Sequence, residues 1–499
     1  MPVVIIDGTS YTVPSGTRLG ELLAREGKLG MPCGGHGRCG KCKVAAWGAL
    51  NRLTEKEERF LSGEEIAVGI RLACMAVAEG DCFVRIGDEK QSQIRIEGEN
   101  PSVRLHPAFA LYGCAVDIGT TTLAACLYDG KGNMLARAGC RNPQAGWGAD
   151  VVSRIDAALG GAARELADAV RKAVDGLLFQ MTEEAGISCR EVDGMVITGN
   201  TVMLHLLTDT CVEPLSHAPF ALKRRFGETM QAGALGLRAA APDALVYLPP
   251  CIAAFAGADL VTALLASGIC RKQETGMLVD IGTNGEMALM RDGILSVCSA
   301  AAGPAFEGAG ISSGMQGKCG AIDRVSLRKG ELDAHVIGGT TAEGICGSGV
   351  VDAIACLLEN GGIDETGYME AESIPIMPSV ALTQKDVRMV QLAKGAVNAG
   401  IRTLLHRADT GFGEVAELLV AGGFGSYLDV ENAGRIGLIP KELVPKVRTI
   451  GNAALSGAAM LLLNDDYRIV CEKYAADAKT IELSGDAFFS EEYMTQMMF

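Results

Sequence analysis

The stretch Asp280-Ile281-Gly282-Thr283-Asn284-Gly285-Glu286 decides the fold of this chain. It follows the apolar run 277–279 and leads into a second apolar run, 287–289. Apolar runs on both sides of a glycine turn predict strand, tight turn and strand. A near copy, Asp-Ile-Gly-Thr-Thr-Thr at 117–122, lies between two further apolar runs. Because glycine turns present backbone N–H groups and hydroxyls to anions, this pair predicts two lobes around one phosphate chain.

Composition narrows the class of protein. The chain has 499 residues, enough for roughly two to four domains, and its 48% hydrophobic content with 64 glycines is typical of a globular protein rich in turns. The formal net charge of −15 argues against nucleic-acid binding. The start MPVVIIDGTS lacks a signal-peptide pattern, and no apolar stretch reaches the ~18 residues of a membrane span. We therefore expect a cytoplasmic protein that makes no membrane contact, with its cysteines in metal sites or in the core.

The cysteine pattern of residues 1–88 predicts a metal centre. Cys33, Cys39 and Cys42 lie in CGGHGRCGKC with the spacing C-x5-C-x2-C, and Cys74 follows in RLAC. Three thiolates from one glycine-rich loop and a fourth from elsewhere suit a 2Fe–2S cluster. A zinc site of four cysteines is the alternative, although zinc ribbons use two C-x2-C pairs. His36 is expected at the edge of the loop, and Cys82 is a substitute for Cys74 as the distant ligand.

The rest of the chain predicts an α/β body with an internal repeat. Residues 89–112 are expected to form a linker, 113–275 a first lobe, and 276–499 a second lobe with a C-terminal tail. Helical patterns cover 150–185, broken at Gly160-Gly161, and 384–407. The tail from residue 466 is expected to hold one strand, Thr480 to Leu483. Two strand-rich hairpins, each followed by helices, indicate the repeat.

The acids of the two glycine loops indicate a cation site. Asp117 and Asp280 would repel phosphate directly, but carboxylate oxygens are ligands that Mg²⁺ prefers. Two structural turns are the alternative for these loops. Glu286, which directly follows the second loop, is expected to be a solvated strand residue. The chain has no G-x-x-x-x-G-K-[ST] sequence, so a P-loop is excluded.

Several motifs resemble a known superfamily. VDIGTTTLAACLYD, VDIGTNGEMAL and LLVAGGFGS resemble the two phosphate loops and the adenosine loop of the ASKHA superfamily, which includes acetate and sugar kinases, heat-shock chaperone ATPases and actin. Combined with the cysteine motif, ITGNTVMLHLL, SAAAGPAFEG and GICGSGVVDAI, they resemble the ATP-dependent reductive activators of corrinoid enzymes. The resemblance implies an N-terminal β-grasp ferredoxin-like domain followed by a two-lobed ASKHA body. Some such activators carry an extra middle domain between linker and body, or further cysteine-rich segments, whereas here the linker is short and one set of cluster cysteines is present, so a compact 2Fe–2S member is expected.

The resemblance also implies a function. The expected reaction is ATP-dependent, one-electron reduction of a corrinoid protein of a methyltransferase system from Co(II) to Co(I). The electron would pass through the 2Fe–2S cluster from an upstream low-potential donor. The expected cofactors are the cluster, ATP and Mg²⁺, and the protein is a possible homodimer.

Residue roles follow from the same resemblance. Cys33, Cys39, Cys42 and Cys74 would hold the cluster. Asp117 and Asp280 would hold Mg²⁺, and Asp280 is also expected in catalysis. Nucleotide contacts are expected from Gly119, Thr120, Thr121, Gly282, Thr283, Asn284 and Gly347 around the phosphates, and from Gly422, Gly423 and Gly425 under adenosine. Glu307 would orient water or hold metal, with a surface loop acid as the alternative. Ser299 would face the partner's cobalt, with a plain turn serine as the alternative.

Three other functions compete with this interpretation. A small-molecule kinase with an accessory cluster would need a substrate pocket with a catalytic acid or base, and no sequence feature indicates one. An activator of 2-hydroxyacyl-CoA dehydratases, another low-potential radical system, would hold a 4Fe–4S cluster between subunits and would lack the N-terminal domain. A non-enzymatic electron carrier would need no nucleotide cleft.

Overall fold

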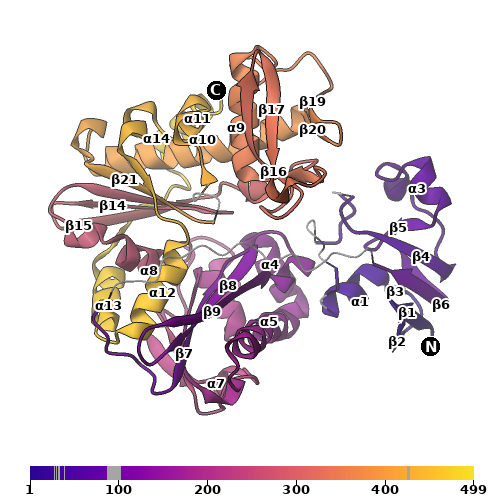
Figure 1. Ribbon diagram of the computed structural model, residues 1–499, viewed down its shortest axis with the longest axis horizontal. Helices are drawn as coiled ribbons and strands as arrows, with labels where there is room; N and C mark the ends of the chain where they lie inside the picture. Colours follow the sequence, from indigo (N-terminus) through magenta and orange to yellow (C-terminus); the bar gives the residue numbers. More distant parts are fainter. Residues whose placement is uncertain (27, 30, 32–33, 39, 87–102, 424–426) are drawn as a thin grey trace. The chain divides into compact units, whose positions relative to one another are not determined.

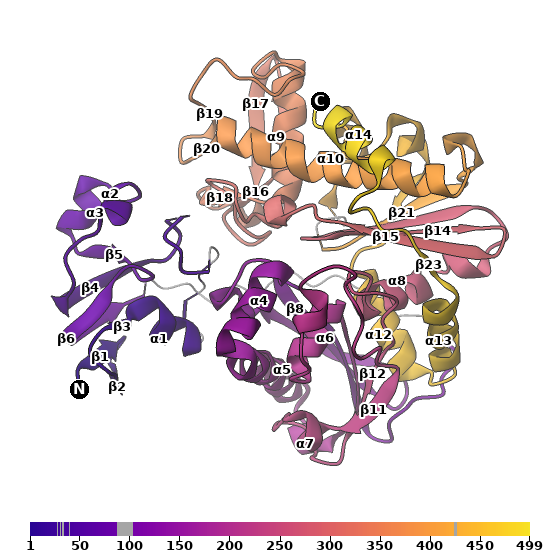
Figure 2. The same cartoon turned by 180° about the vertical axis from the view of Figure 1, so that it is seen from behind.

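A computed structural model describes residues 1–499 except 27, 30, 32, 33, 39, 87–102 and 424–426 (Figures 1 and 2). The chain forms two compact units. One contains Met1–Ser92 and Arg141–Ala173, and the other contains Gln93–Cys140 and Val174–Phe499. Among the described residues, no helix combines the length and apolar character that crossing a membrane requires.

The N-terminal part of the first unit is a β-grasp domain. Its strands are β1 (Val3–Ile6), β2 (Thr9–Thr12), β3 (Thr17–Arg18), β4 (Lys43–Leu50), β5 (Ile70–Leu72) and β6 (Val77–Arg85). They form a mixed sheet of order β2-β1-β6-β4-β5, with β3 on β6 and a central parallel pair, β1 and β6. Helix α1 (Leu19–Arg25) contributes Leu19, Leu22 and Leu23 to the core. Helices α2 (Glu55–Glu58) and α3 (Gly63–Ala67) lie between β4 and β5. The predicted ferredoxin-like fold is confirmed.

The first unit also contains a broken helical region. It includes α4 (Val151–Ala157), a π-turn over Ala158–Ala162 and the start of α5 (Ala163–Ala185). Gly161 has a φ of 104°, a left-handed conformation that favours glycine. The predicted break at Gly160-Gly161 is therefore confirmed.

The second unit contains two six-stranded sheets with the same order of core strands. The first, of order β11-β12-β10-β7-β8-β9, consists of β7 (Tyr112–Ile118), β8 (Thr122–Asp129), β9 (Met134–Arg141), β10 (Val192–Gly199), β11 (Glu228–Gln231) and β12 (Leu245–Leu248). The second, of order β22-β21-β13-β14-β15-β23, consists of β13 (Gly276–Ile281), β14 (Gly285–Arg291), β15 (Ile294–Ala300), β21 (Glu417–Ala421), β22 (Val447–Thr449) and β23 (Lys479–Thr480). In each sheet an antiparallel meander is extended by a parallel strand, β10 beside β7 and β21 beside β13. The predicted strand–turn–strand units and the internal repeat are confirmed.

Helices cover these sheets. They are α6 (Thr201–Leu207), α7 (Ala232–Leu235), α8 (Ala258–Ser267), α9 (Gly347–Glu359), α10 (Gln384–Arg407), α11 (Val430–Arg435), α12 (Ala453–Leu463), α13 (Tyr467–Asp477) and α14 (Ala487–Thr495). Strands β16 (Ala321–Arg328), β17 (Glu331–Val336) and β18 (Gly344–Ile345) form a small sheet beside α9, and β19 (Ser373–Met377) pairs with β20 (Val380–Thr383). Figure 1 shows the long α10 running over the sheet of β14 and β21.

The last helices return to the first sheet. Helix α12 packs against α8, β7 and β10, and its leucines share one core cluster with Ala115 and Val196. The segment 466–499, expected to be a tail with one strand, instead contains α13 and α14, and its strand β23 lies at Lys479–Thr480. The apolar residues of these two helices show only a weak helical periodicity, so the sequence did not predict them. The boundaries 1–88, 89–112, 113–275 and 276–499 stay predictions.

Candidate functional site

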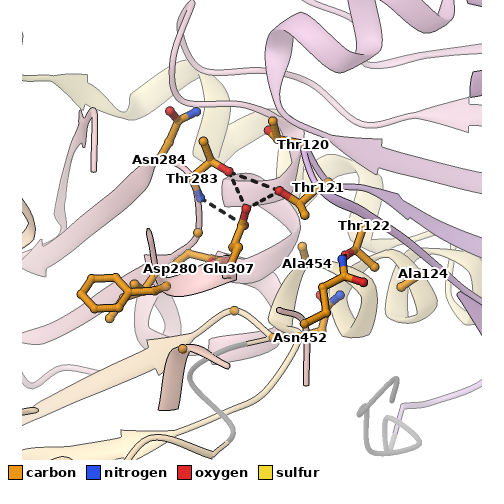
Figure 3. A pocket seen from close by; sticks show the side chains of 18 of the residues that line it. Thr120, Thr121, Thr122, Ala124, Asp280, Thr283, Asn284, Glu307, Asn452 and Ala454 are labelled. Atoms are coloured by element: carbon orange, nitrogen blue, oxygen red, sulfur yellow. Dashed lines mark hydrogen bonds between the residues drawn. The ribbon is translucent and has the colours of Figure 1, made fainter. Parts of the chain in front are cut away.

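A cavity of about 270 Å³ opens between the two repeated hairpin turns of the second unit (Figure 3). Both turns form its wall, and helix-start segments complete it. Of the predicted site residues, the lining includes Asp117, Gly119, Thr120, Thr121, Asp280, Gly282, Thr283, Asn284, Glu307, Gly347, Gly422 and Gly423. Their roles as ligands of a nucleotide or a metal stay predictions.

One predicted residue, Ser299, does not join this group. Ser299 lies on β15 opposite Glu286 and is not among the residues that line the cavity. Gly425 lies outside the described residues. Gly422, three positions earlier, has a φ of 100°, and a Cβ there would lie 2.7 Å from the carbonyl oxygen of Ile281. The backbone therefore passes close to the end of β13 at a position that only glycine fits.

A carboxylate joins the two turns. Glu307 ends a short 3-10 helix, Pro304–Glu307, and accepts hydrogen bonds from the hydroxyls of Thr121 and Thr283. The distance from Thr283 Oγ1 to Glu307 Oε2 is 2.6 Å, and the Thr283 backbone N–H donates to Oε1 at 3.1 Å. Figure 3 shows these bonds converging on one side chain. The predicted alternative of a plain surface acid is wrong, because Glu307 contacts both repeated turns.

Four carboxylates gather behind the turns. Asp117 and Asp280 are joined by Asp259, at the start of α8, and Glu286, on β14. Burial, the dominant cause, raises the pKa of Asp117 to about 6 and that of Asp280 to about 7, and the charges of Asp117 and Glu307 add to the effect at Asp280. Burial and mutual repulsion also raise the pKa values of Asp259 and Glu286. So much negative charge favours a bound cation.

Glu286 was predicted to be solvated, and this is wrong, since its side chain is only 6% exposed. The strand register explains why. Asp280 lies directly opposite Glu286 in the β13–β14 pair, so both side chains share one face of the sheet. The register follows from the length of the turn between the two strands, so the position of Glu286 opposite Asp280 could have been predicted from the sequence. Asp259 had no comparable local signal.

The described residues contain no group of three or more His, Cys, Asp or Glu side chains placed to hold a metal directly. Mg²⁺ commonly takes one or two carboxylates and completes its shell with water and phosphate oxygens. The cavity acids fit that mode of binding.

Two capping asparagines hold the first turn. Asn200 caps α6 through the Met203 N–H and donates from Nδ2 to Thr120 Oγ1 at 3.0 Å. Asn452 caps α12 through the Leu455 N–H and donates from Nδ2 to Asp117 Oδ2 at 2.9 Å. Each amide thus connects a helix start to the turn, a role that sequence reasoning missed.

The cysteine site lies in the β-grasp domain. Cys42 Sγ and Cys74 Sγ are 3.1 Å apart, and each residue is 2% exposed. Two adjacent buried thiols fit the soft sulfur ligand set of an iron–sulfur cluster. Cys33 and Cys39 lie outside the described residues. Cys82, the alternative to Cys74, lies on β6 opposite Val4 and Gly48.

A buried ion pair supports the segment before Cys74. Glu57 accepts from Arg71 Nε at 2.8 Å and from Arg71 Nη2 at 3.0 Å. It also accepts from the Leu72 N–H at 3.1 Å. Burial alone would raise the pKa of Glu57, but Arg71 and the backbone donors lower it below its ordinary value. The pair holds the chain that leads into Cys74, a predicted cluster ligand.

A ferredoxin-type domain joined to a duplicated α/β body with an acid-lined cavity defines an iron–sulfur protein of the ASKHA fold. Comparisons with known families agree. The 2Fe-2S iron-sulfur cluster binding domain matches residues 4–79, and the RACo middle region matches 112–272. The C-terminal domain of RACo, its ASKHA domain, matches 274–499. The chain belongs to the RACo family.

Relatives have informative names. The corrinoid activation enzyme RamQ of Eubacterium limosum is 35% identical over 421 residues, covering 78% of this chain and 70% of that protein. The Co(II) methylated amine-specific corrinoid protein reductase of Methanosarcina barkeri is 28% identical over 435 residues, covering 78% of each chain. The solved structure of a reductive activator for corrinoid, iron-sulfur protein superposes with a TM-score of 0.75 at 26% identity, covering 100% of this chain and 98% of that one.

Proposed function

We propose that this protein reactivates a corrinoid protein by one-electron reduction of its cobalt from Co(II) to Co(I), driven by ATP. The observation that carries the proposal is that one chain of the RACo family combines a 2Fe-2S binding domain with a cavity between two phosphate-loop turns. The names of two relatives, a corrinoid activation enzyme and a corrinoid protein reductase, support the same substrate.

Electron transfer belongs to the β-grasp domain. A 2Fe–2S cluster bound by Cys33, Cys39, Cys42 and Cys74 supplies a one-electron carrier. The domain accepts one electron from an upstream low-potential donor and passes it to the partner's Co(II), which becomes Co(I). The Glu57–Arg71 pair keeps the Cys74 segment rigid while the charge of the domain changes.

Nucleotide binding belongs to the cavity. The turns containing Thr121 and Thr283 bind the phosphates, and Gly422 and Gly423 allow the backbone to approach adenosine. Asp117 and Asp280 hold Mg²⁺ directly or through its waters, and Asp259 and Glu286 add negative charge behind them. Asn452 orients Asp117 for this role.

ATP is needed because the electron moves uphill. For one electron, each ~59 mV of unfavourable potential difference costs about 1.4 kcal/mol. ATP favours one arrangement of the two lobes, and that arrangement binds the Co(II) form of the partner differently from the Co(I) form. Release of the reduced partner follows hydrolysis. Ser299 as a contact to cobalt, and a homodimer, remain parts of this proposal.

Reconstitution tests the proposal. The purified protein, reduced chemically, is mixed with Mg-ATP and a candidate corrinoid protein, and Co(I) formation is followed by absorbance. We expect Co(I) only when ATP is present, together with ATP hydrolysis that the corrinoid protein stimulates. ATP hydrolysis that leaves every tested corrinoid protein as Co(II) would overturn the proposal and favour a kinase.

A further inference from the structure

Glu307 occupies an anion site formed by both lobes. Thr121 comes from the β7–β8 turn and Thr283 from the β13–β14 turn, and both hydroxyls donate to Glu307 Oε2. The Thr283 N–H donates to Oε1 at 3.1 Å, and the two hydroxyl oxygens lie 3.5 Å apart. One carboxylate therefore satisfies the donors of two elements that are far apart in the sequence (Figure 3).

These donors match the needs of a phosphate group. Hydroxyls and a backbone N–H in a glycine turn are the groups that bind phosphate oxygens in proteins. A carboxylate and a phosphate cannot accept the same hydrogen bonds at once. While the carboxylate of Glu307 stays in place, its negative charge and that of nearby Asp280 would also oppose the approach of a phosphate group.

The backbone around Glu307 favours a defined position for this carboxylate. The Gly303 N–H donates to the carbonyl oxygen of Thr283 at 2.9 Å, which attaches the Glu307 segment to the second turn. Gly308, just after Glu307, has a φ of 77°, and a Cβ there would lie 2.3 Å from the carbonyl oxygen of Met315. The backbone of the segment is therefore bonded to the second turn at Gly303 and closely packed against Met315 at Gly308, so displacing the carboxylate would require its side chain to turn away.

We propose that Glu307 is a specificity-determining residue that competes with the terminal phosphate of ATP for Thr121 and Thr283. The proposal rests on the proposed use of ATP. In the nucleotide-free protein the carboxylate joins the two turns in place of a phosphate. A triphosphate that reaches the donors displaces it, whereas a diphosphate leaves the carboxylate in place. The residue thus lowers the preference for ATP over ADP and couples its own release to ATP binding.

Equilibrium binding tests this role. Affinities for a non-hydrolysable ATP analogue and for ADP, both with Mg²⁺, are measured by calorimetry on the full chain with its cluster bound. In Glu307→Ala the competitor is gone, and we expect affinity for the ATP analogue to rise roughly tenfold, a change of about 1.4 kcal/mol. Affinity for ADP is expected to change less than threefold. Glu307→Gln, which keeps the shape but loses the charge, should give an intermediate result.

A matched control separates competition from overall charge. Glu331→Ala removes one negative charge from an exposed position on β17 and should leave both affinities unchanged. Equal gains for the ATP analogue and ADP in Glu307→Ala, or no gain for either, would overturn the competition. If the unaltered protein binds neither nucleotide, the proposed function fails as well. Intact cluster absorbance and far-UV circular dichroism confirm that each variant is folded.

Discussion

At the scale of single residues, the cavity gathers four acidic side chains, Asp117, Asp259, Asp280 and Glu286. Burial raises the pKa values of Asp117 and Asp280, and at Asp280 the charges of Asp117 and Glu307 add to the effect. Asp259 and Glu286 add to the same repulsion. Because these acids repel one another when ionised, the stability of the metal-free protein should depend on pH.

Metal-free protein should lose stability as pH rises. The pKa values of Asp117 and Asp280 lie near 6 and 7 in the folded protein, against 3.8 ordinarily. Between about pH 4 and about pH 7 the folded protein retains protons that the unfolded chain has lost, so the free energy of unfolding falls with pH. Differential scanning fluorimetry without metal or nucleotide should show a falling Tm, and Asp280→Asn should flatten part of that slope. An identical slope in this variant would contradict the assignment.

The Glu57–Arg71 pair gives a second prediction for single residues. The Glu57 side chain is 0% exposed and that of Arg71 is 11% exposed. Glu57→Ala therefore removes the opposite charge from a buried guanidinium, which keeps its hydrogen bonds to Asn51 and Arg52. Such losses destabilise proteins by about 3–5 kcal/mol. We expect a clearly lower Tm and faster loss of cluster absorbance on warming. The neighbouring exposed Glu58→Ala should leave both unchanged.

At the scale of elements, helix α12 connects parts of the chain that are far apart in sequence. It packs against α8 and β7, while Asn452 at its start holds Asp117. Close packing depends on Gly457, because a Cβ there would lie 1.9 Å from the carbonyl oxygen of Thr262 in α8. The position of α12 thus affects the acid that we propose binds Mg²⁺.

Gly457→Ala should force α12 away from α8. Overpacking of this kind costs about 1–3 kcal/mol, so Tm should fall, and the shift of Asn452 should reduce ATP hydrolysis. The control is Gly176→Ala in α5, where a Cβ meets nothing within 4 Å. That substitution should be neutral or stabilising by up to about 1 kcal/mol, since alanine favours helices. Equal effects of the two changes would show that close packing at Gly457 is unimportant.

At the scale of the whole molecule, electron transfer and nucleotide chemistry depend on different units. Cys42 and Cys74, two of the four predicted cluster ligands, lie in the β-grasp domain, and the cavity acids lie in the second unit. The proposed reaction requires both units, but each can be measured separately, the first by the EPR signal of the cluster and the second by ATP hydrolysis. Substitutions in one unit should therefore leave the signal of the other intact.

Two reciprocal variants test this separation. Asp280→Ala should abolish ATP-dependent Co(II) reduction and leave the cluster's EPR signal unchanged. Cys42→Ser should lose the native cluster signal and the reduction, but retain at least half of the basal ATP hydrolysis. Loss of the cluster signal in Asp280→Ala would mean that the loop is structural instead of a nucleotide site.

The sequence alone determined features that depend on local patterns. The predicted helix 384–407 coincides with α10, and both glycine turns join the strands expected. Side-chain periodicity and turn chemistry are properties of neighbouring residues, so one sequence is enough to recognise them. The cysteine spacing likewise indicated the cluster domain that the family comparison supports.

Only the tertiary structure decided which distant residues meet. Asn452 and Asp117 are 335 positions apart, yet they share a hydrogen bond, and Glu307 joins two turns from different sheets. The burial of Asp259 and the return of α12 to the first sheet depend on the packing of the complete core. No local pattern encodes such contacts, because they form only when whole elements dock. The stretch from Asp280 to Glu286 was recognisable as a turn from its sequence, but the hydrogen bonds from Thr283 to Glu307 and the acidic surroundings of Asp280 come from the fold.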